Sequence, residues 1–317
     1  MKTNHAVVNQ VPPLEGFDVA NYPVITEYLD RVGAAESLPE LHELGQMAGS
    51  AEWITVGDLA EEHPPVLETH DRFGNRIDVV RYDPSYHRLM DTAVGHGLAG
   101  HPWASADPHA HLVRSAKFSV WTAVDSGHGC PISMTYAVIP ALRHNADLAA
   151  QYEPLLTTRH YDSALKAPLT KPGLIAGMSM TEKQGGSDLR QTQTVARFAE
   201  TTGEGQVYRL NGHKWFFSVP QSDGFFTLAH AKAGDLVVTH RGVRHRGRDG
   251  PAVAPVFDDP LVVVPRRIRH DGRVRRRQLR ERTALLRCVA AVLVACRVVD
   301  VLSAGQAYPL AALEHDR

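Results

Sequence analysis

The spacing of the apolar residues changes once along this chain of 317 residues, and the change falls near Pro172. Before that proline, apolar side chains recur every three or four residues, which is the pattern of amphipathic helices. After it, short apolar runs and alternating stretches are typical of strands. Helices followed by antiparallel strands favour an α+β fold, with the two kinds of element segregated, over a doubly wound sheet.

Local signals place the expected elements. Ser37, with a proline and then Glu40 after it, resembles a helix start with a capping hydroxyl. Asn211-Gly212 favours the type I′ turn of an antiparallel hairpin, which would join residues 206–210 to residues 213–218. Further helices are expected from Pro23, from Asp83, over 110–124 and over 131–143 with a bend or break at Pro140, and further strands over 174–180, 192–199 and 225–231.

The composition changes near residue 233. Residues 233–317 contain 16 Arg and no Lys, Asn, Met or Trp, whereas Lys and Arg are mixed, at 7 and 11, before that point. The net charge of −1 therefore divides into −8 over residues 1–234 and +7 over residues 235–317. A residue set restricted to GC-rich codons also arises when a gene is translated out of frame. We therefore favour an out-of-frame or degenerate tail over an arm that binds DNA phosphates nonspecifically, because clustered arginines carry no base-reading information.

The chain is expected to have four segments and to be a soluble protein of the reducing cytoplasm. Its start lacks the apolar core of a signal peptide, its three cysteines form no CxxC pair, and its longest apolar run is too short to cross a membrane. The segments are an extended arm (1–22), a helical N-terminal domain (23–172), an incomplete antiparallel β-domain (173–232) and the Arg-rich tail of doubtful fold (233–317).

Two weaker signals in the helical part do not predict a site. Gly95-His-Gly-Leu-Ala-Gly100 spells GxGxxG, but it follows a helical run instead of a strand, so no dinucleotide site is expected. His101, His109 and His111 lie in a polar segment interrupted by proline, without the four close ligands of structural zinc. No metal site is expected.

The segment Gly177-Met-Ser-Met-Thr-Glu-Lys-Gln-Gly-Gly-Ser-Asp188 has the composition of a ligand-binding loop. Its paired glycines let the backbone approach a bulky ligand, and its hydroxyls and N–H groups can cradle phosphate oxygens. An ordinary polar turn between strands is an equally good interpretation of these residues by themselves.

The segment Asn211-Gly-His-Lys-Trp-Phe-Phe-Ser218 contains three consecutive aromatic residues. These could form a stacking platform beside a planar ring, with the Ser218 hydroxyl as a hydrogen-bond partner. The alternative is a hairpin whose aromatic side chains fill the core of a sheet, which is the more common role of such residues.

Taken together, at this spacing, the two segments resemble the acyl-CoA dehydrogenase superfamily, in which M-T-E-x-x-x-G-S-D and a later N-G-x-K-x-W-[IF]-[TS] line one flavin site. The strings MTEKQGGSD and NGHKWFFSVPQSD are similar to the AidB branch, the flavoproteins of the adaptive response to alkylation damage. The arm Asn9–Leu14 and the segments Cys130–Thr135 and Thr158–Asp162 also fit that branch. The resemblance covers roughly residues 1–232.

The resemblance implies FAD as the cofactor, an acyl-CoA thioester as the substrate and flavin-dependent α,β-dehydrogenation as the reaction. Met180 and Thr181 would contact the flavin ring, Thr181 through its hydroxyl. Gly186 and Ser187 would meet the pyrophosphate of FAD or the neighbouring acyl-CoA channel. In such a site the cofactor carries the redox chemistry while the protein positions and polarises it.

The second segment would supply the residues beside the flavin ring. Phe216 takes the place of the usual Trp beside the isoalloxazine, Trp215 precedes it by one residue, and Ser218 matches the hydroxyl residue that faces flavin N5.

The chain departs from the family after residue 232. Family members continue into a C-terminal four-helix bundle that supplies the catalytic glutamate, contacts to the FAD adenosine and much of the oligomer interface, and the AidB branch adds a basic DNA-binding region. None of these motifs is recognisable here, and Glu281 and Glu314, the glutamates after Glu204, lie in no matching context. We therefore name no catalytic residue, expect impaired turnover and doubt the family's homo-oligomer. The alternatives are a non-enzymatic, DNA-associated protein of the alkylation response and a nonfunctional frameshifted fragment.

Overall fold

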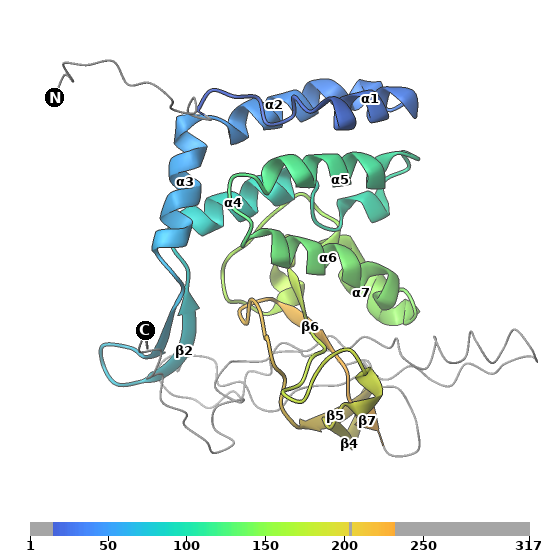
Figure 1. Ribbon diagram of the computed structural model, residues 1–317. Helices are drawn as coiled ribbons and strands as arrows, with labels where there is room; N and C mark the ends of the chain where they lie inside the picture. The colour runs from blue at the N-terminus through green and yellow to red at the C-terminus, as the bar shows by residue number, and fades with distance from the viewer. Residues whose placement is uncertain (1–14, 203–204, 232–317) are drawn as a thin grey trace, which may run out of the picture.

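The computed structural model describes residues 15–202 and 205–231 (Figure 1). The expectations for the first part of the arm and for the Arg-rich tail fall on residues 1–14 and 232–317, outside the described residues. Helices precede the main strands along the chain, so the predicted α+β class is confirmed. The α-helices are α1 (Pro23–Arg31), α2 (Leu38–Ala48), α3 (Ala51–Glu62), α4 (Pro84–Gly95), α5 (Ala110–Trp121), α6 (Gly129–Leu142) and α7 (Ala146–Leu156).

Predicted helix starts agree with the structure, although not always for the expected reason. Asp83 accepts a hydrogen bond from the Ser85 N–H at 2.8 Å and so caps α4. Ser37 precedes α2 as expected, but its hydroxyl donates backwards to the Ala34 carbonyl at 2.7 Å instead of capping the helix. Helix α6 continues through Pro140, so the chain is not broken there.

The sequence analysis missed α3, α7 and a hairpin between α3 and α4. Strand β1 (Val66–His70) pairs antiparallel with β2 (Arg76–Arg81), and the two project from the end of α3 in Figure 1. The Asp71 carboxylate closes the hairpin loop by accepting from the N–H groups of Phe73 and Asn75. The caps of the two missed helices, Ser50 and Asn145, are present in the sequence.

The β part contains two small sheets. Strand β3 (Ala176–Ser179) pairs parallel with β6 (Gly224–Thr227), and β4 (Val195–Thr202) lies between an antiparallel β5 (Gly205–Asn211) and a parallel β7 (His230–Ala231). The predicted hairpin between residues 206–210 and 213–218 is wrong, because β5 pairs with β4 and residues 213–218 form no strand. The expected antiparallel pairing therefore holds for β4 with β5, whereas β3 with β6 and β4 with β7 pair in parallel.

The helical and β parts share a hydrophobic cluster that fixes where the two motif segments lie. Side chains of α6 and α7, among them Val138 and Leu156, pack with Phe226 of β6. Thr135 of α6 reinforces this contact, because its hydroxyl accepts from the Ala176 N–H of β3 at 3.0 Å. The larger helical core centres on the fully buried Trp121. In the described residues, every helix is too short or too polar to span a bilayer.

Candidate functional site

The two motif segments lie against each other just beyond β3. The Trp215 N–H donates to the Thr181 carbonyl at 2.9 Å, and the Lys183 N–H donates to Nε2 of His213 at 3.0 Å. Residues that are about thirty positions apart in the sequence thus run side by side. The structure brings the predicted residues Thr181 and Trp215 together through backbone and not through their side chains.

Glu182 is the side chain that ties the segments together. It is 1% exposed, and its Oε1 accepts from the Thr194 N–H at 3.0 Å, the Thr194 hydroxyl at 2.5 Å and the Lys214 ammonium at 2.9 Å. Its Oε2 accepts from the Gln193 N–H at 2.6 Å and from the Gln184 amide at 2.7 Å. Both oxygens of this carboxylate are therefore saturated by donors from three segments of the chain.

The electrostatics of this pair follow from its burial. Burial alone would raise the pKa of Glu182, but hydrogen bonds from Thr194, Gln193 and Lys214 outweigh it and hold the pKa well below its usual range. Burial lowers the pKa of Lys214, and its contact with Glu182 offsets only part of that effect. Glu182 is thus a permanent anion that holds structure and is not free to take up a proton.

The paired glycines allow the first segment to fold back on itself. Glu182 and Gly185 form a β-bridge, and Gly185 has a φ of +144°, a conformation that favours glycine. A Cβ on Gly186 would lie 2.7 Å from the Thr181 hydroxyl oxygen, so only glycine lets the backbone pass this close to Thr181. Ser187, the next predicted residue, is exposed.

Two of the predicted site residues, Thr181 and Ser218, carry a hydroxyl group. Among the described residues, neither Thr181 Oγ1 nor Ser218 Oγ makes a hydrogen bond, and both residues are half-buried. Met180 is also half-buried and packs on the cluster between α6, α7 and the β strands. Free hydroxyls beside apolar surface can bond to the heteroatoms of a planar ligand.

The three consecutive aromatics divide between surface and core. Trp215 is 47% exposed and Phe216 is 79% exposed, whereas the Phe217 ring packs on the buried Phe225 with centroids 4.5 Å apart. Phe216 and Val219 both have φ of +54°, which is uncommon for a bulky or β-branched residue. Neither sequence interpretation holds for all three residues, because two face outward and one fills the core.

Glu182 and Lys214 are the residues that the sequence analysis missed. Both stand inside the quoted motif strings, and their opposite charges were the available signal. Within the described ranges, no cluster of three or more His, Cys, Asp or Glu side chains is arranged to hold a metal ion.

Known proteins are similar to much of this chain. The model of the adaptive response protein AidB N-terminal domain matches residues 9–163. The chain is 40% identical over 236 residues to AidB of Escherichia coli (strain K12), which covers 73% of this chain and 42% of that protein. It is 29% identical over 185 residues to acyl-CoA dehydrogenase family member 11 of Caenorhabditis elegans, covering 57% of this chain and 28% of that protein. The chain spans less than half the length of either relative.

Solved structures share the fold. The apo form of Bd2924 matches with a TM-score of 0.60 and 22% identity, covering 89% of this chain and 55% of that one. Caenorhabditis elegans ACDH-11, crystallised in complex with C11-CoA, matches with a TM-score of 0.57 and 24% identity, covering 76% of this chain and 41% of that one.

Proposed function

Because this chain carries an AidB-like segment of the acyl-CoA dehydrogenase superfamily, we propose that its two motif segments form one wall of an FAD site. Members of that family generally use FAD, and the residues present suit a flavin. The observation that carries the proposal is the hydrogen bond from the Trp215 N–H to the Thr181 carbonyl. It joins two segments in which the Thr181 and Ser218 hydroxyls have no partner among the described residues and the rings of Trp215 and Phe216 are exposed.

Each of these groups would have a role toward a planar, phosphate-bearing cofactor. Thr181 and Ser218 would donate hydrogen bonds to ring heteroatoms, and Trp215 or Phe216 would cover an apolar ring face. Gly186 and the exposed Ser187 would present backbone N–H groups and a hydroxyl to a pyrophosphate, because the space beside the preceding Gly185 is open. When bound, FAD would supply the hydride acceptor of the family reaction.

We propose an acyl-CoA-like thioester as the substrate class of this chain. ACDH-11 was crystallised with C11-CoA, and the family name points to the same chemistry. We also propose that turnover is impaired, because the family's catalytic glutamate belongs to a C-terminal bundle, and Glu281 and Glu314, the glutamates after Glu204, lie in no matching sequence context.

A role in the alkylation response and a cytoplasmic location belong to the same proposal, since the matching family is that of an adaptive response protein. The alternative, a DNA-associated protein without enzymatic activity, depends on the arginines of residues 233–317, which lie outside the described residues.

Reconstitution with FAD tests the proposal. The purified full chain should retain stoichiometric flavin after desalting and should turn yellow. Thr181→Val should weaken retention by about three- to tenfold, the worth of one hydrogen bond. The control Thr55→Val removes an exposed hydroxyl that bonds only within α3, and it should bind FAD normally. A folded, colourless chain that takes up no FAD would refute the proposal that the two motif segments form part of an FAD site.

Turnover is measured separately on the reconstituted protein. With an acyl-CoA, in the absence of oxygen and of any other electron acceptor, we expect flavin to stay oxidised or to bleach very slowly. Rapid bleaching of flavin would contradict the proposed impairment while leaving the FAD site itself supported.

A further inference from the structure

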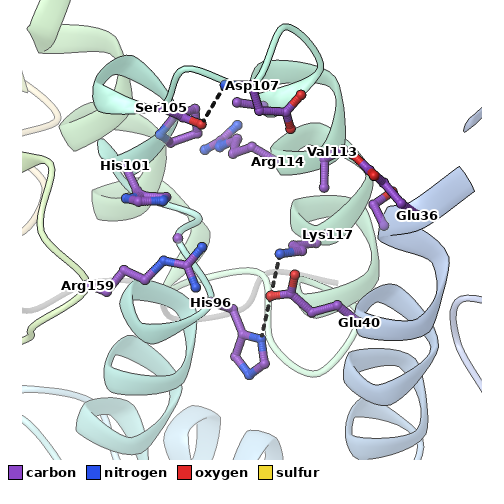
Figure 2. Close-up of a pocket in the computed structure, with 14 residues that line it drawn as sticks. Glu36, Glu40, His96, His101, Ser105, Asp107, Val113, Arg114, Lys117 and Arg159 are labelled. Atoms are coloured by element: carbon purple, nitrogen blue, oxygen red, sulfur yellow. Dashed lines mark hydrogen bonds and ion pairs between the residues drawn. The ribbon is translucent and has the colours of Figure 1, made fainter. Parts of the chain in front are cut away.

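A polar pocket lies in the helical part of the molecule, between α2, α4, α5 and the segment after α7 (Figure 2). Its cavity volume is about 240 Å³, and none of the residues of the two motif segments lines it. The pocket is therefore separate from the proposed flavin wall, and a ligand could occupy it whether or not the chain binds FAD.

The glycine-rich segment Gly95–Gly100, at the end of α4, contributes His96 and Gly97 to the lining of this pocket. A Cβ on Gly100 would lie 2.3 Å from the Leu156 carbonyl oxygen, so the segment packs directly on the end of α7. Gly97 has a φ of +76°, and a Cβ there would lie 3.0 Å from the His101 ring and 3.5 Å from Nε of Arg159. Gly97 thus leaves room for these two side chains in the lining of the pocket.

The carboxylates that line the pocket are mostly engaged. Lys117 contacts Glu40 at 2.5 Å and His96 lies 3.7 Å from the same oxygen; His96 and Lys117 lower the pKa of Glu40 to about 2. Asp107 accepts from the His109 N–H at 2.8 Å. Glu36, the remaining carboxylate, is exposed and lies across the pocket from Arg159 in Figure 2.

Among the described residues, Arg159 is a lining cation without a direct carboxylate contact, although its charge helps to lower the pKa of Glu40. Arg114 donates to the Leu98 carbonyl at 2.7 Å and lies over two aromatic rings, and Lys117 is paired with Glu40. Among the described residues, Arg159 has neither a hydrogen bond nor an ion pair, and its guanidinium lies on the same side of the pocket as His101 in Figure 2. A free guanidinium fork at a concave site matches a tetrahedral oxyanion.

His101 adds an acceptor beside this donor. Its Nδ1 lies 3.3 Å from the Thr157 carbonyl, which can only accept, so Nδ1 carries the proton and Nε2 has the lone pair in the neutral ring. Burial, reinforced by the charge of Arg159, lowers the pKa of His101 and keeps the ring neutral at pH 7. The pair therefore offers donors and an acceptor side by side.

We propose that this pocket binds a phosphoryl oxyanion that has a hydroxyl next to it: Arg159 pairs with the anionic oxygens, and His101 accepts the hydroxyl proton. Hydrogen phosphate carries such a hydroxyl on phosphorus, and a sugar phosphate carries one on its sugar. Sulfate has the same shape and charge but no hydroxyl, so it distinguishes this arrangement from simple attraction of anions.

Calorimetric titration of the full chain at pH 7.5 tests the site, with inorganic phosphate, ribose 5-phosphate and sodium sulfate as ligands at one ionic strength. We expect saturable binding of at least one phosphoryl ligand, and sulfate about three- to tenfold weaker. Arg159→Gln should lose at least about tenfold in affinity. The matched control Arg72→Gln, at the exposed tip of the β1–β2 hairpin, should bind like the wild type.

A second variant isolates the acceptor. His101→Phe keeps a ring in place but removes Nε2, so phosphate and sulfate should then bind with equal affinity.

The melting temperature separates lost binding from lost folding. Because Arg159 is exposed, Arg159→Gln should leave the melting temperature unchanged.

Each outcome decides the proposal. Tighter ribose 5-phosphate would identify a sugar phosphate, tighter inorganic phosphate would identify the free ion, and both support the site. Absence of saturable binding, equal binding by wild type and Arg159→Gln, or wild-type affinity for sulfate equal to that for phosphate would overturn it.

Discussion

Replacing Glu182 by glutamine tests how the two motif segments are held together. The substitution keeps the shape of a side chain that is 1% exposed, but turns one acceptor oxygen into a donor that faces other donors. It also leaves the Lys214 ammonium, whose side chain is 7% exposed, without its counter-charge. Removing one partner of a buried ion pair costs about 3–5 kcal/mol, which is a large share of the roughly 5–15 kcal/mol that stabilises a typical protein.

Denaturation of the full chain measures this cost. For a protein of this size, about 3–5 kcal/mol corresponds to a melting temperature lower by roughly 6–20 °C. The matched control is Glu52→Gln, because Glu52 forms an ion pair with Arg88 on the surface, where its side chain is 67% exposed. That change should alter the free energy of unfolding by less than about 1 kcal/mol.

The double variant Glu182→Gln, Lys214→Met separates the pair from the other contacts of Glu182. With the cation also removed, no unpaired buried charge remains, and part of the lost stability should return. A double variant as unstable as the sum of the two single variants would show that the two charges are not coupled. A Glu182→Gln protein as stable as Glu52→Gln would refute the assigned role of Glu182 outright.

The same pair makes a prediction about pH. The pKa of Glu182 is lower in the folded chain than the unfolded value of 4.5, so its stabilising contribution is complete above about pH 4.5 and declines as the pH falls toward the folded value. The stability difference between wild type and Glu182→Gln should therefore shrink below about pH 4.5. Lys214 is present in both proteins, so its own titration largely cancels in the comparison. A difference that grows on acidification would contradict the sign of this shift.

Three further substitutions probe the framework. Gly177→Ala would place a Cβ 2.2 Å from the buried Phe225 ring and should lower the free energy of unfolding by about 1–3 kcal/mol in a denaturant titration, whereas Gly95→Ala, which faces open space, should be neutral or slightly stabilising. Thr135→Val leaves a buried N–H of β3 without its acceptor and should cost about 1–3 kcal/mol in the same assay; no loss would mean that α6 and β3 are held by apolar packing alone. Asp83→Ala removes the cap of α4 and should cost about 1 kcal/mol, seen as a lower melting temperature, and an unchanged temperature would refute the capping role.

Local signals placed several elements correctly, although the equally local caps Ser50 of α3 and Asn145 of α7 were missed. Asp83 followed by Pro84 marks a helix start whatever lies around it, because the cap bonds to an N–H two residues away. The missed hairpin of β1 and β2 is different, since its strands are largely exposed and lack the alternation of buried and exposed side chains that reveals a strand. The hairpin loop is closed by the Asp71 carboxylate and by Gly74, which has a left-handed backbone conformation. These two residues indicate a turn but not the strands on either side of it.

The failed hairpin at Asn211-Gly212 shows why the motif surface could not be derived from turn preferences. Gly212 lies so close to Thr194 that a Cβ would be 2.6 Å from its Cα, and the chain leaves β5 there instead of turning back along it. A type I′ turn is favoured by small local energies, whereas the next residues gain the buried contact of Lys214 with Glu182 and the hydrogen bond of the Trp215 N–H to the Thr181 carbonyl. These partners lie thirty or more positions away and are invisible to a local pattern. The non-local contacts direct the chain from β5 onto the first motif, and the exposed ring of Trp215 follows from that path.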